Sequence, residues 1–129
     1  MSDVPDAAAA RGSAAAAVSN LVVRLFGEYT GRGPTNARTF MDGDLVTVVL
    51  RDLLTKGERS LVADGHKEQV LSMRLAFQQT MRDDLVAGVE TILERKVTAF
   101  LSANHVEPDI AIETFLLEPA AEDELAATL

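Results

Sequence analysis

The stretch HKEQVLSMRLAFQQTMRDDLVAGVETILER, residues 66–95, decides the fold of this chain. Its apolar side chains recur in steps of three and four residues, at Val70, Met73, Phe77, Met81, Leu85, Val89 and Ile92. That spacing gathers them on one side of an α-helix. At about 1.5 Å per residue such a helix measures roughly 45 Å, and we expect the other elements to pack along it.

Two forms of this helix fit the sequence. The unbroken apolar stripe favours one long helix, straight or kinked. The acidic pair Asp83-Asp84 instead allows a second helix to start after a break near Arg82, because carboxylates stabilise a helix N-terminus. We favour the single helix, and we expect the charged residues between its apolar positions, Arg74 among them, to face solvent.

A further helix is predicted over residues 14–29, with an apolar stripe formed by Val18, Leu21, Val22, Leu25 and Phe26. Gly31 suits a helix C-cap, and Pro34 prevents the helix from continuing. Residues 1–13 are mostly small or polar, and we expect a disordered lead-in there.

The first of two predicted β-hairpins joins strands at residues 37–41 and 45–51 through the turn dipeptide Asp42-Gly43. If Met41 lies opposite Asp44, alternate side chains of both strands share a face. The better core face then carries Ala37, Thr39, Met41, Val46, Val48 and Leu50, and the other face carries Arg38, Phe40, Leu45, Thr47, Val49 and Arg51.

Thr55 and Glu58 fit a capping box that starts a short helix through Val62, before the long one. The second hairpin follows the long helix. Its strands are predicted at residues 97–102 and 110–117, around a segment rich in turn formers at 104–109. Both faces of its last strand carry apolar residues.

These elements predict an α+β fold of order α-ββ-α-α-ββ, with one four-stranded, mostly antiparallel sheet in a two-layer sandwich. We expect this domain at residues 14–118 and an acidic tail at 119–129. The face without helices would show Phe40 and Leu45 from the first hairpin, and Phe100 or Phe115 from the second, as interface residues. Because an apolar patch of this kind usually marks a partner surface, we expect a homodimer to cover it, with cover by one of the helices as the alternative.

The composition limits the classes of partner. A net charge of −8 argues against binding to nucleic acid or to an anionic membrane surface. No stretch reaches the roughly 18 consecutive apolar residues of a membrane-spanning helix, so no direct membrane insertion is expected. The N-terminus lacks a secretory signal pattern and the chain has no cysteine, so we expect a cytoplasmic protein.

The segment Gly31-Arg32-Gly33-Pro34 is the most conspicuous short motif, since glycines beside an arginine can hold an anion. Its place after a helix C-terminus, whose partial charge is negative, favours a structural turn instead. Lys56, at the start of the short helix, is a second candidate anion contact, although Glu58 competes for the same amides. Arg32, Gly33 and Lys56 are therefore candidate ligand or partner contacts.

His105, Asp109 and Glu113 are the residues best suited to acid–base or metal chemistry. However, His105 falls in a predicted turn, and no second histidine stands at metal-ligand spacing. GxSxG, Walker A and dinucleotide-binding motifs are all missing. We therefore assign no catalytic residue, metal or cofactor, and keep these three residues as candidate ligand or partner contacts.

Several segments together resemble one bacterial family. They are Gly31-Arg32-Gly33-Pro34 before a hairpin, Leu54-Thr55 with Glu58 after it, and residues 104–109 (NHVEPD) followed by 113–117 (ETFLL). From about Val18 to Glu118 the chain resembles the MpsC-like family, which is named for a Na+-translocating membrane-potential-generating system and was earlier a domain of unknown function. The resemblance implies a small component associated with membrane ion transport, without established catalytic residues. The positions that match the family's motifs are Gly31, Arg32, Gly33, Pro34, Thr55, Glu58, His105, Pro108, Asp109 and Glu113.

Three functions fit the sequence. We place first a small, soluble, non-enzymatic interaction or regulatory module, dimeric and accessory to a membrane ion-transport or signalling system, with a membrane protein among its partners. The second is a sensor that binds a small anion or nucleotide near Arg32 and Lys56. The third is a hydrolase-like or metal enzyme that uses His105, Asp109 and Glu113.

Overall fold

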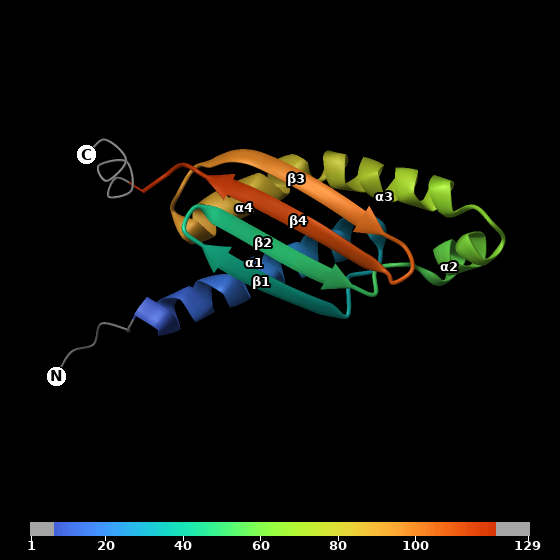
Figure 1. Ribbon diagram of the computed structural model, residues 1–129, viewed down its shortest axis with the longest axis horizontal. Helices are drawn as coiled ribbons and strands as arrows, with labels where there is room; N and C mark the ends of the chain where they lie inside the picture. Colours follow the sequence, from blue (N-terminus) through green and yellow to red (C-terminus); the bar gives the residue numbers. More distant parts are fainter. Residues whose placement is uncertain (1–6, 121–129) are drawn as a thin grey trace.

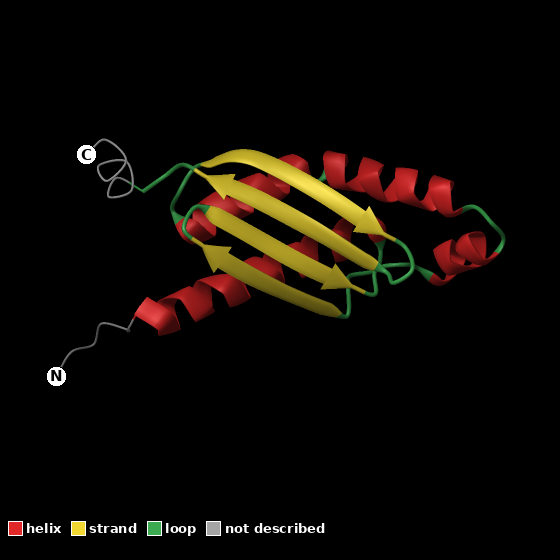
Figure 2. Cartoon of the chain, viewed as in Figure 1, coloured by secondary structure: helices red, strands yellow, loops and turns green. Residues whose placement is uncertain are grey.

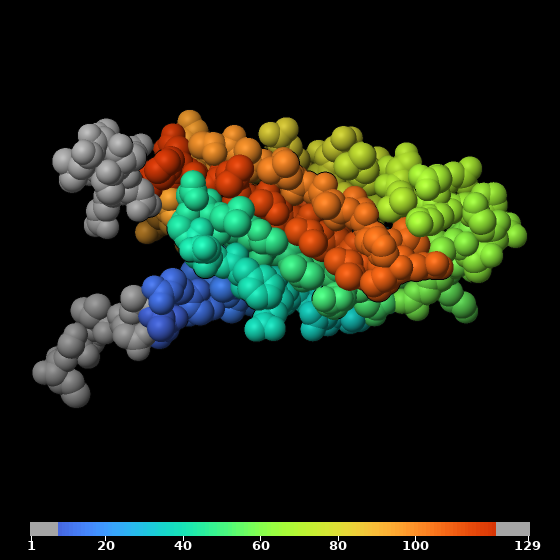
Figure 3. Space-filling view, viewed as in Figure 1, coloured from blue at the N-terminus to red at the C-terminus, as the bar shows by residue number. Residues whose placement is uncertain are grey.

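The computed structural model describes residues 7–120, which form two layers (Figure 1). The elements in chain order are α1 (Ala7–Thr30), β1 (Asn36–Asp42), β2 (Leu45–Arg51), α2 (Lys56–Ala63), α3 (Lys67–Thr80), α4 (Arg82–Leu93), β3 (Val97–His105) and β4 (Ile110–Leu117). The strands lie side by side in front, α1 and α4 pass behind them, and α3 runs along the edge of the sheet beside β3 (Figures 1 and 2). One face of the sheet is therefore covered by helices, and the other, the open face, is seen in Figure 3.

The sheet has the strand order β1-β2-β4-β3, and all neighbouring strands are antiparallel. The central pair β2–β4 joins the two hairpins into one sheet, as predicted. The predicted α+β class is confirmed, with one helix more than expected between the hairpins.

The preferred single helix over residues 66–95 is wrong, because the chain forms α3 and α4 with a break at Met81. The Met81 backbone leaves helical values, with φ −90° and ψ 1°. Its side chain is fully buried, so the apolar stripe continues across the break and hides it from the sequence pattern. Asp83 and Asp84 lie in the first turn of α4, where carboxylates favour a helix start.

The first helix begins at Ala7 rather than at Ala14, so residues 7–13 are helical and not a lead-in. Alanine has the highest helix propensity, which explains why this alanine-rich segment continues the helix. Gly31, with φ 81°, ends α1 as predicted, and its N–H donates to Gly27 O. The rest of the predicted lead-in, residues 1–6, and residues 121–129 of the predicted tail lie outside the described residues.

The turn of the first hairpin lies one residue later than predicted. Asp42 pairs with Leu45 and Met41 pairs with Val46, so Gly43 and Asp44 form the turn. Gly43 has φ 60°, a left-handed value that glycine adopts without strain. Because the register changes by two residues, side chains keep their faces, and the predicted core face is confirmed.

The core fills the space between the covered face of the sheet and the helices. Its fully buried members include Val46, Val48 and Leu50 from β2 and Val18, Val22, Leu85 and Val89 from the helices. Within residues 7–120, no helix has both the length and the apolar character needed to cross a membrane.

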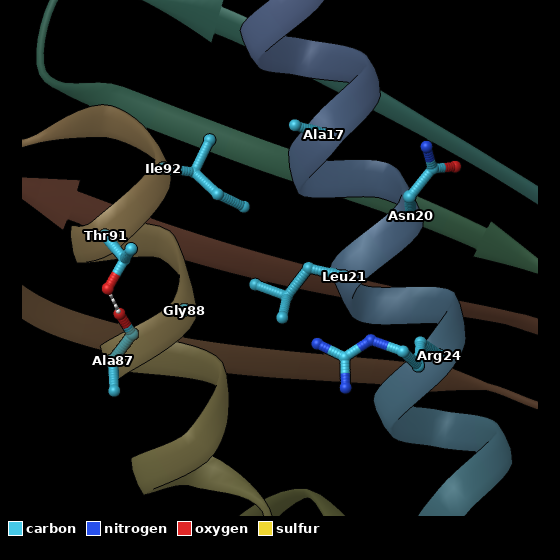
Figure 4. A pocket seen from close by; sticks show the side chains of 8 residues that line it. All are labelled: Ala17, Asn20, Leu21, Arg24, Ala87, Gly88, Thr91 and Ile92. Carbon is cyan, nitrogen blue, oxygen red and sulfur yellow. Dashed lines mark hydrogen bonds between the residues drawn. The ribbon is translucent and has the colours of Figure 1, made fainter.

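Helices α1 and α4 approach each other closely at Gly88. Figure 4 shows Leu21 of α1 pointing toward this glycine. A Cβ on Gly88 would lie 2.5 Å from Leu21 Cδ2, so only glycine leaves the leucine its place. The groove around this contact is lined by Ala17, Asn20, Arg24, Ala87, Thr91 and Ile92.

We expect Gly88→Ala to be less stable than Gly27→Ala, its matched control. A methyl group at Gly88 has to displace the buried Leu21 side chain, whereas one at Gly27 meets only Gly33 N, at 3.8 Å. Overpacking costs about 1–3 kcal/mol, while both variants replace glycine in the same kind of structure. Urea unfolding measures the difference, and equal midpoints would mean that Leu21 turns aside without cost.

Candidate functional site

The open face of the sheet exposes a group of large apolar side chains. Phe40 on β1, Leu45 on β2 and Leu101 on β3 are 49%, 40% and 55% exposed. The strands β2 and β4 lie between β1 and β3 on this face (Figure 3), and they contribute partly buried aliphatic side chains. Together they form the open-face cluster, which consists of Phe40, Leu45, Val49, Leu101, Ile112 and Leu116.

Phe40 and Leu45 lie on the open face, but the prediction is wrong for Phe100 and Phe115. Phe115 is fully buried beneath the helices, and its ring centroid lies 5.0 Å from that of Phe100. Side chains alternate along β4, and its positions 111, 113, 115 and 117 are the buried ones. Ile112 and Leu116 therefore take the open face.

A buried polar cluster lies on the covered face, between α3 and the second hairpin; it consists of Gln78, Ser102, Asn104 and Glu113. Gln78 Nε2 donates to Glu113 Oε1 at 2.6 Å and to Asn104 Oδ1 at 2.9 Å. Asn104 Nδ2 donates to Gln78 Oε1 at 2.7 Å, and Ser102 Oγ donates to Glu113 Oε2. Both oxygens of the fully buried Glu113 carboxyl are thus hydrogen-bonded.

Burial raises the pKa of Glu113 from 4.5 to about 7, because a carboxylate loses hydration in the interior. The hydrogen bonds from Ser102 and Gln78 and the charge of Arg74 oppose this shift. The side chain can therefore gain or lose a proton near neutral pH.

Arg74 is 5% exposed and lies one helical turn before Gln78 on α3. Its Nη2 donates to Asp109 Oδ1 at 2.7 Å, and its Nη1 donates to Ile110 O at 3.3 Å. The second oxygen, Asp109 Oδ2, accepts the backbone N–H groups of residues 53 and 54 at 2.8 and 2.7 Å. Asp109 thereby joins three segments: α3, the end of the first hairpin and the start of β4.

Arg32 is paired within the chain. Its Nη2 lies 2.8 Å from Asp52 Oδ2, and Asp52 also pairs with Arg59. The hydrogen bond from Thr35, with a smaller contribution from Arg32, lowers the pKa of Asp52. A Cβ at Gly33 would lie 3.1 Å from a carbonyl oxygen of α1, so this glycine allows close packing of the loop. Both motif residues thus have structural contacts.

Lys56 is exposed at the first position of α2. The predicted capping box is confirmed: Thr55 Oγ1 accepts from Glu58 N at 3.1 Å, and Glu58 Oε1 accepts from Thr55 N at 2.9 Å. A carboxylate of the chain therefore already lies at the N-terminus of α2.

The structure does not bring His105 together with Asp109 and Glu113. His105 is exposed at the end of β3, with its Nδ1 2.8 Å from Pro108 O. Asp109 and Glu113 instead bind residues of α3 on the covered side. Across the described range 7–120, no group of three or more His, Cys, Asp or Glu side chains is placed to hold a metal ion.

Sequence reasoning missed Arg74 and Gln78. Arg74 was expected to face solvent and is buried, whereas Met73, assigned to the apolar stripe, is 40% exposed. The available signal is the spacing of Val70, Arg74 and Gln78, since residues four apart share one side of a helix. Arg74 and Gln78 share the side of the helix that carries Val70. If that side is buried, both polar residues need hydrogen-bonding partners in the interior.

The fold and these sites define an α+β domain with a hydrogen-bonded polar cluster on one side of its sheet and an apolar open face on the other. A family model described as "Na+-translocating membrane potential-generating system (MpsC)" matches residues 10–119. The chain therefore belongs to the MpsC family, and the resemblance seen in the sequence is confirmed. Searches of curated proteins and of solved structures each found no match.

We expect Glu113→Gln to remove a pH-dependent loss of stability. Because its pKa rises from 4.5 in the unfolded chain to about 7, Glu113 holds its proton more tightly in the folded state. The stability this adds is complete below pH 4.5 and is lost as the pH rises to about 7. The loss is about 3 kcal/mol, at ~1.4 kcal/mol per unit of pKa.

Urea unfolding of both proteins across this pH range measures the effect, and contributions of other carboxyls cancel in the difference. Glutamine keeps a donor for Ser102 and an acceptor for Gln78 without a charge. The free energy of unfolding of the variant should therefore rise relative to that of the wild type as the pH rises. Parallel stability curves would show that Glu113 titrates normally.

We expect Asp109→Asn to destabilise the protein far more than Asp52→Asn, the matched control. The first change leaves the buried Arg74 charge without its carboxylate, which costs about 3–5 kcal/mol. Asp52 and its arginine partners have side chains 34–55% exposed, so solvent screens the charges and the second change should destabilise the protein much less. Thermal unfolding, monitored by circular dichroism, compares the two variants. Similar Tm values would argue against a stabilising role for the contacts of Asp109 with Arg74 and with residues 53 and 54.

Proposed function

We propose that this chain is a soluble, cytoplasmic, non-enzymatic interaction module that forms a homodimer through its open face and regulates or accompanies a membrane ion-translocating system. The observation that carries the proposal is the open-face cluster. Phe40, Leu45 and Leu101 are exposed together on one side of a sheet whose other side packs against the helices.

Apolar surface of this extent favours a partner. Burial of a large apolar side chain stabilises a complex by about 1.5–3 kcal/mol at most, and these side chains are already about half-buried. Charged residues lie at the margin of the patch rather than within it, which is the usual anatomy of a protein interface. A second copy presents the same apolar chemistry, and it is always available to the first.

The size of the open face indicates a dimer of modest affinity. Four strands about 4.8 Å apart and β2 with 7 residues at about 3.3 Å each give a face of roughly 20 by 23 Å. This flat area of roughly 460 Å² is smaller than the roughly 800 Å² that each partner buries in a specific interface of standard size. Association should therefore depend on concentration.

The link to membrane transport is supported by the family, whose description names a Na+-translocating membrane potential-generating system. The alternatives have less support in the geometry. A sensor at Arg32 would have to compete with Asp52 for the guanidinium, and an enzyme using His105 would have to reach carboxyls that bind α3 on the opposite face.

We expect Phe40→Asp to weaken self-association while the protein stays folded. The new carboxylate would be desolvated in the dimer but hydrated in the monomer. Sedimentation over a concentration series should show the wild type approaching twice its 13.8 kDa mass, and the variant remaining near 13.8 kDa. Met73→Asp is the control, since Met73 is similarly exposed but lies on α3. A wild type that stays monomeric at every concentration would contradict the dimer.

The same variants test the cellular role. Cells that lack this chain should show a lower membrane potential with a potentiometric dye. The wild type and Met73→Asp should restore it, and Phe40→Asp should not. An unchanged potential in cells lacking the chain would remove the link to ion translocation and leave the dimer unaffected.

A further inference from the structure

The register of the strands arranges the open face in rows that cross the sheet. The central row holds Phe40, Thr47, Thr114 and Leu101. One neighbouring row holds Arg38, Val49, Ile112 and Ala103, and the row on the other side holds Asp42, Leu45, Leu116 and Ala99. The two flanking rows therefore carry opposite charges at β1, branched aliphatic side chains on β2 and β4, and alanine on β3.

The two charges at β1 have no partner of their own in the part of the chain that the structure describes. Within residues 7–120 neither Arg38 nor Asp42 forms an ion pair. The Arg38 guanidinium lies 5.2 Å from the ring centroid of Phe40, so it leans toward the central row on the open face. The open face of the edge strand β1 therefore carries a positive charge at Arg38, an aromatic ring at Phe40 and a negative charge at Asp42.

We propose that a second copy of this chain covers the open face, related to the first by a two-fold axis that runs across the strands along the central row. The inference rests on the proposed function and adds the geometry of the dimer and the residues that set it.

This axis reverses the strand direction and keeps each strand above its own copy. Each flanking row then faces the opposite row of the second copy. Arg38 faces the partner's Asp42, Val49 faces the partner's Leu45, and Ile112 faces the partner's Leu116. Facing sheets lie about 10 Å apart, a gap that an arginine and an aspartate can bridge. The pairing is isologous, so each contact occurs twice.

A two-fold axis parallel to the strands also keeps the strands of the two copies aligned, but it leaves these charges unused. It would place β1 over β3 of the second copy, so that Arg38 would face the partner's Ala103 and Asp42 would face the partner's Ala99. Apolar contacts would still form, but a charge opposite alanine gains nothing and loses hydration. Charge complementarity therefore favours the axis across the strands.

Charge exchange tests this geometry. Arg38→Glu should place Glu opposite the partner's Asp42, and Asp42→Lys should place Lys opposite the partner's Arg38. Each variant alone should self-associate about tenfold or more weakly than the wild type, because both copies of the pair become repulsive. A mixture of the two variants should form heterodimers, since each facing pair then has opposite charges. The double variant Arg38→Glu/Asp42→Lys should recover wild-type association.

Native mass spectrometry of one isotope-labelled and one unlabelled variant identifies the heterodimer, which also shows that both chains are folded. Arg24→Glu is the control, because Arg24 is exposed on α1 away from the open face and should leave association unchanged. The proposed axis would be wrong if the single variants self-associated as strongly as the wild type. It would also be wrong if the single variants self-associated weakly and their mixture formed no heterodimer. In either case, loss of self-association in Phe40→Asp would still support a dimer through the open face.

Discussion

The position of α3 on the sheet depends on two polar side chains that it directs into the interior, Arg74 and Gln78. A buried polar group without a partner costs several kcal/mol, so each must meet a complementary group on the hairpin. Arg74 meets Asp109 and Gln78 meets Glu113. Apolar packing alone tolerates sliding, whereas these two contacts are satisfied in only one register of helix against sheet. Asp109 and Glu113 thus set the position of α3 on the sheet.

The same contacts decide what the molecule shows to its surroundings. Because Glu113 is directed inward, alternation along β4 turns Ile112 and Leu116 outward, beside Phe40 and Leu45 of the first hairpin. The covered side of the second hairpin therefore holds Glu113 beside the core residue Phe115, while aliphatic side chains lie on its open side as well. Because both sides of β4 carry apolar residues, covering one of them leaves the surface that we propose as the interface of this member of the MpsC family. It also places a carboxyl with a pKa of about 7 on the strand whose other side forms that surface.

Elements with one unambiguous period could be read from the sequence. In the first hairpin, polar and apolar residues alternate clearly enough to show which side chains share a face. The predicted faces are correct although the turn was misplaced, because the error in register was two residues. Caps were also readable, because Thr55, Glu58 and Gly31 act through neighbouring backbone groups. The pairing of Arg32 could not be predicted in the same way. Its partner Asp52 lies twenty positions away in the sequence, so no local pattern shows that the Arg32 guanidinium already has a carboxylate.

The sequence by itself determined the α+β class, the order of hairpins and helices apart from the extra break, and the buried face of β2. These features follow from local periodicity and backbone preferences, which need no knowledge of distant residues. Only the tertiary structure decided the break at Met81, the burial of Arg74 and the inward direction of Glu113 and Phe115. The physical reason is that a buried charge or carboxyl is tolerated only with a partner. Here that partner is supplied by a segment more than thirty residues away in the chain.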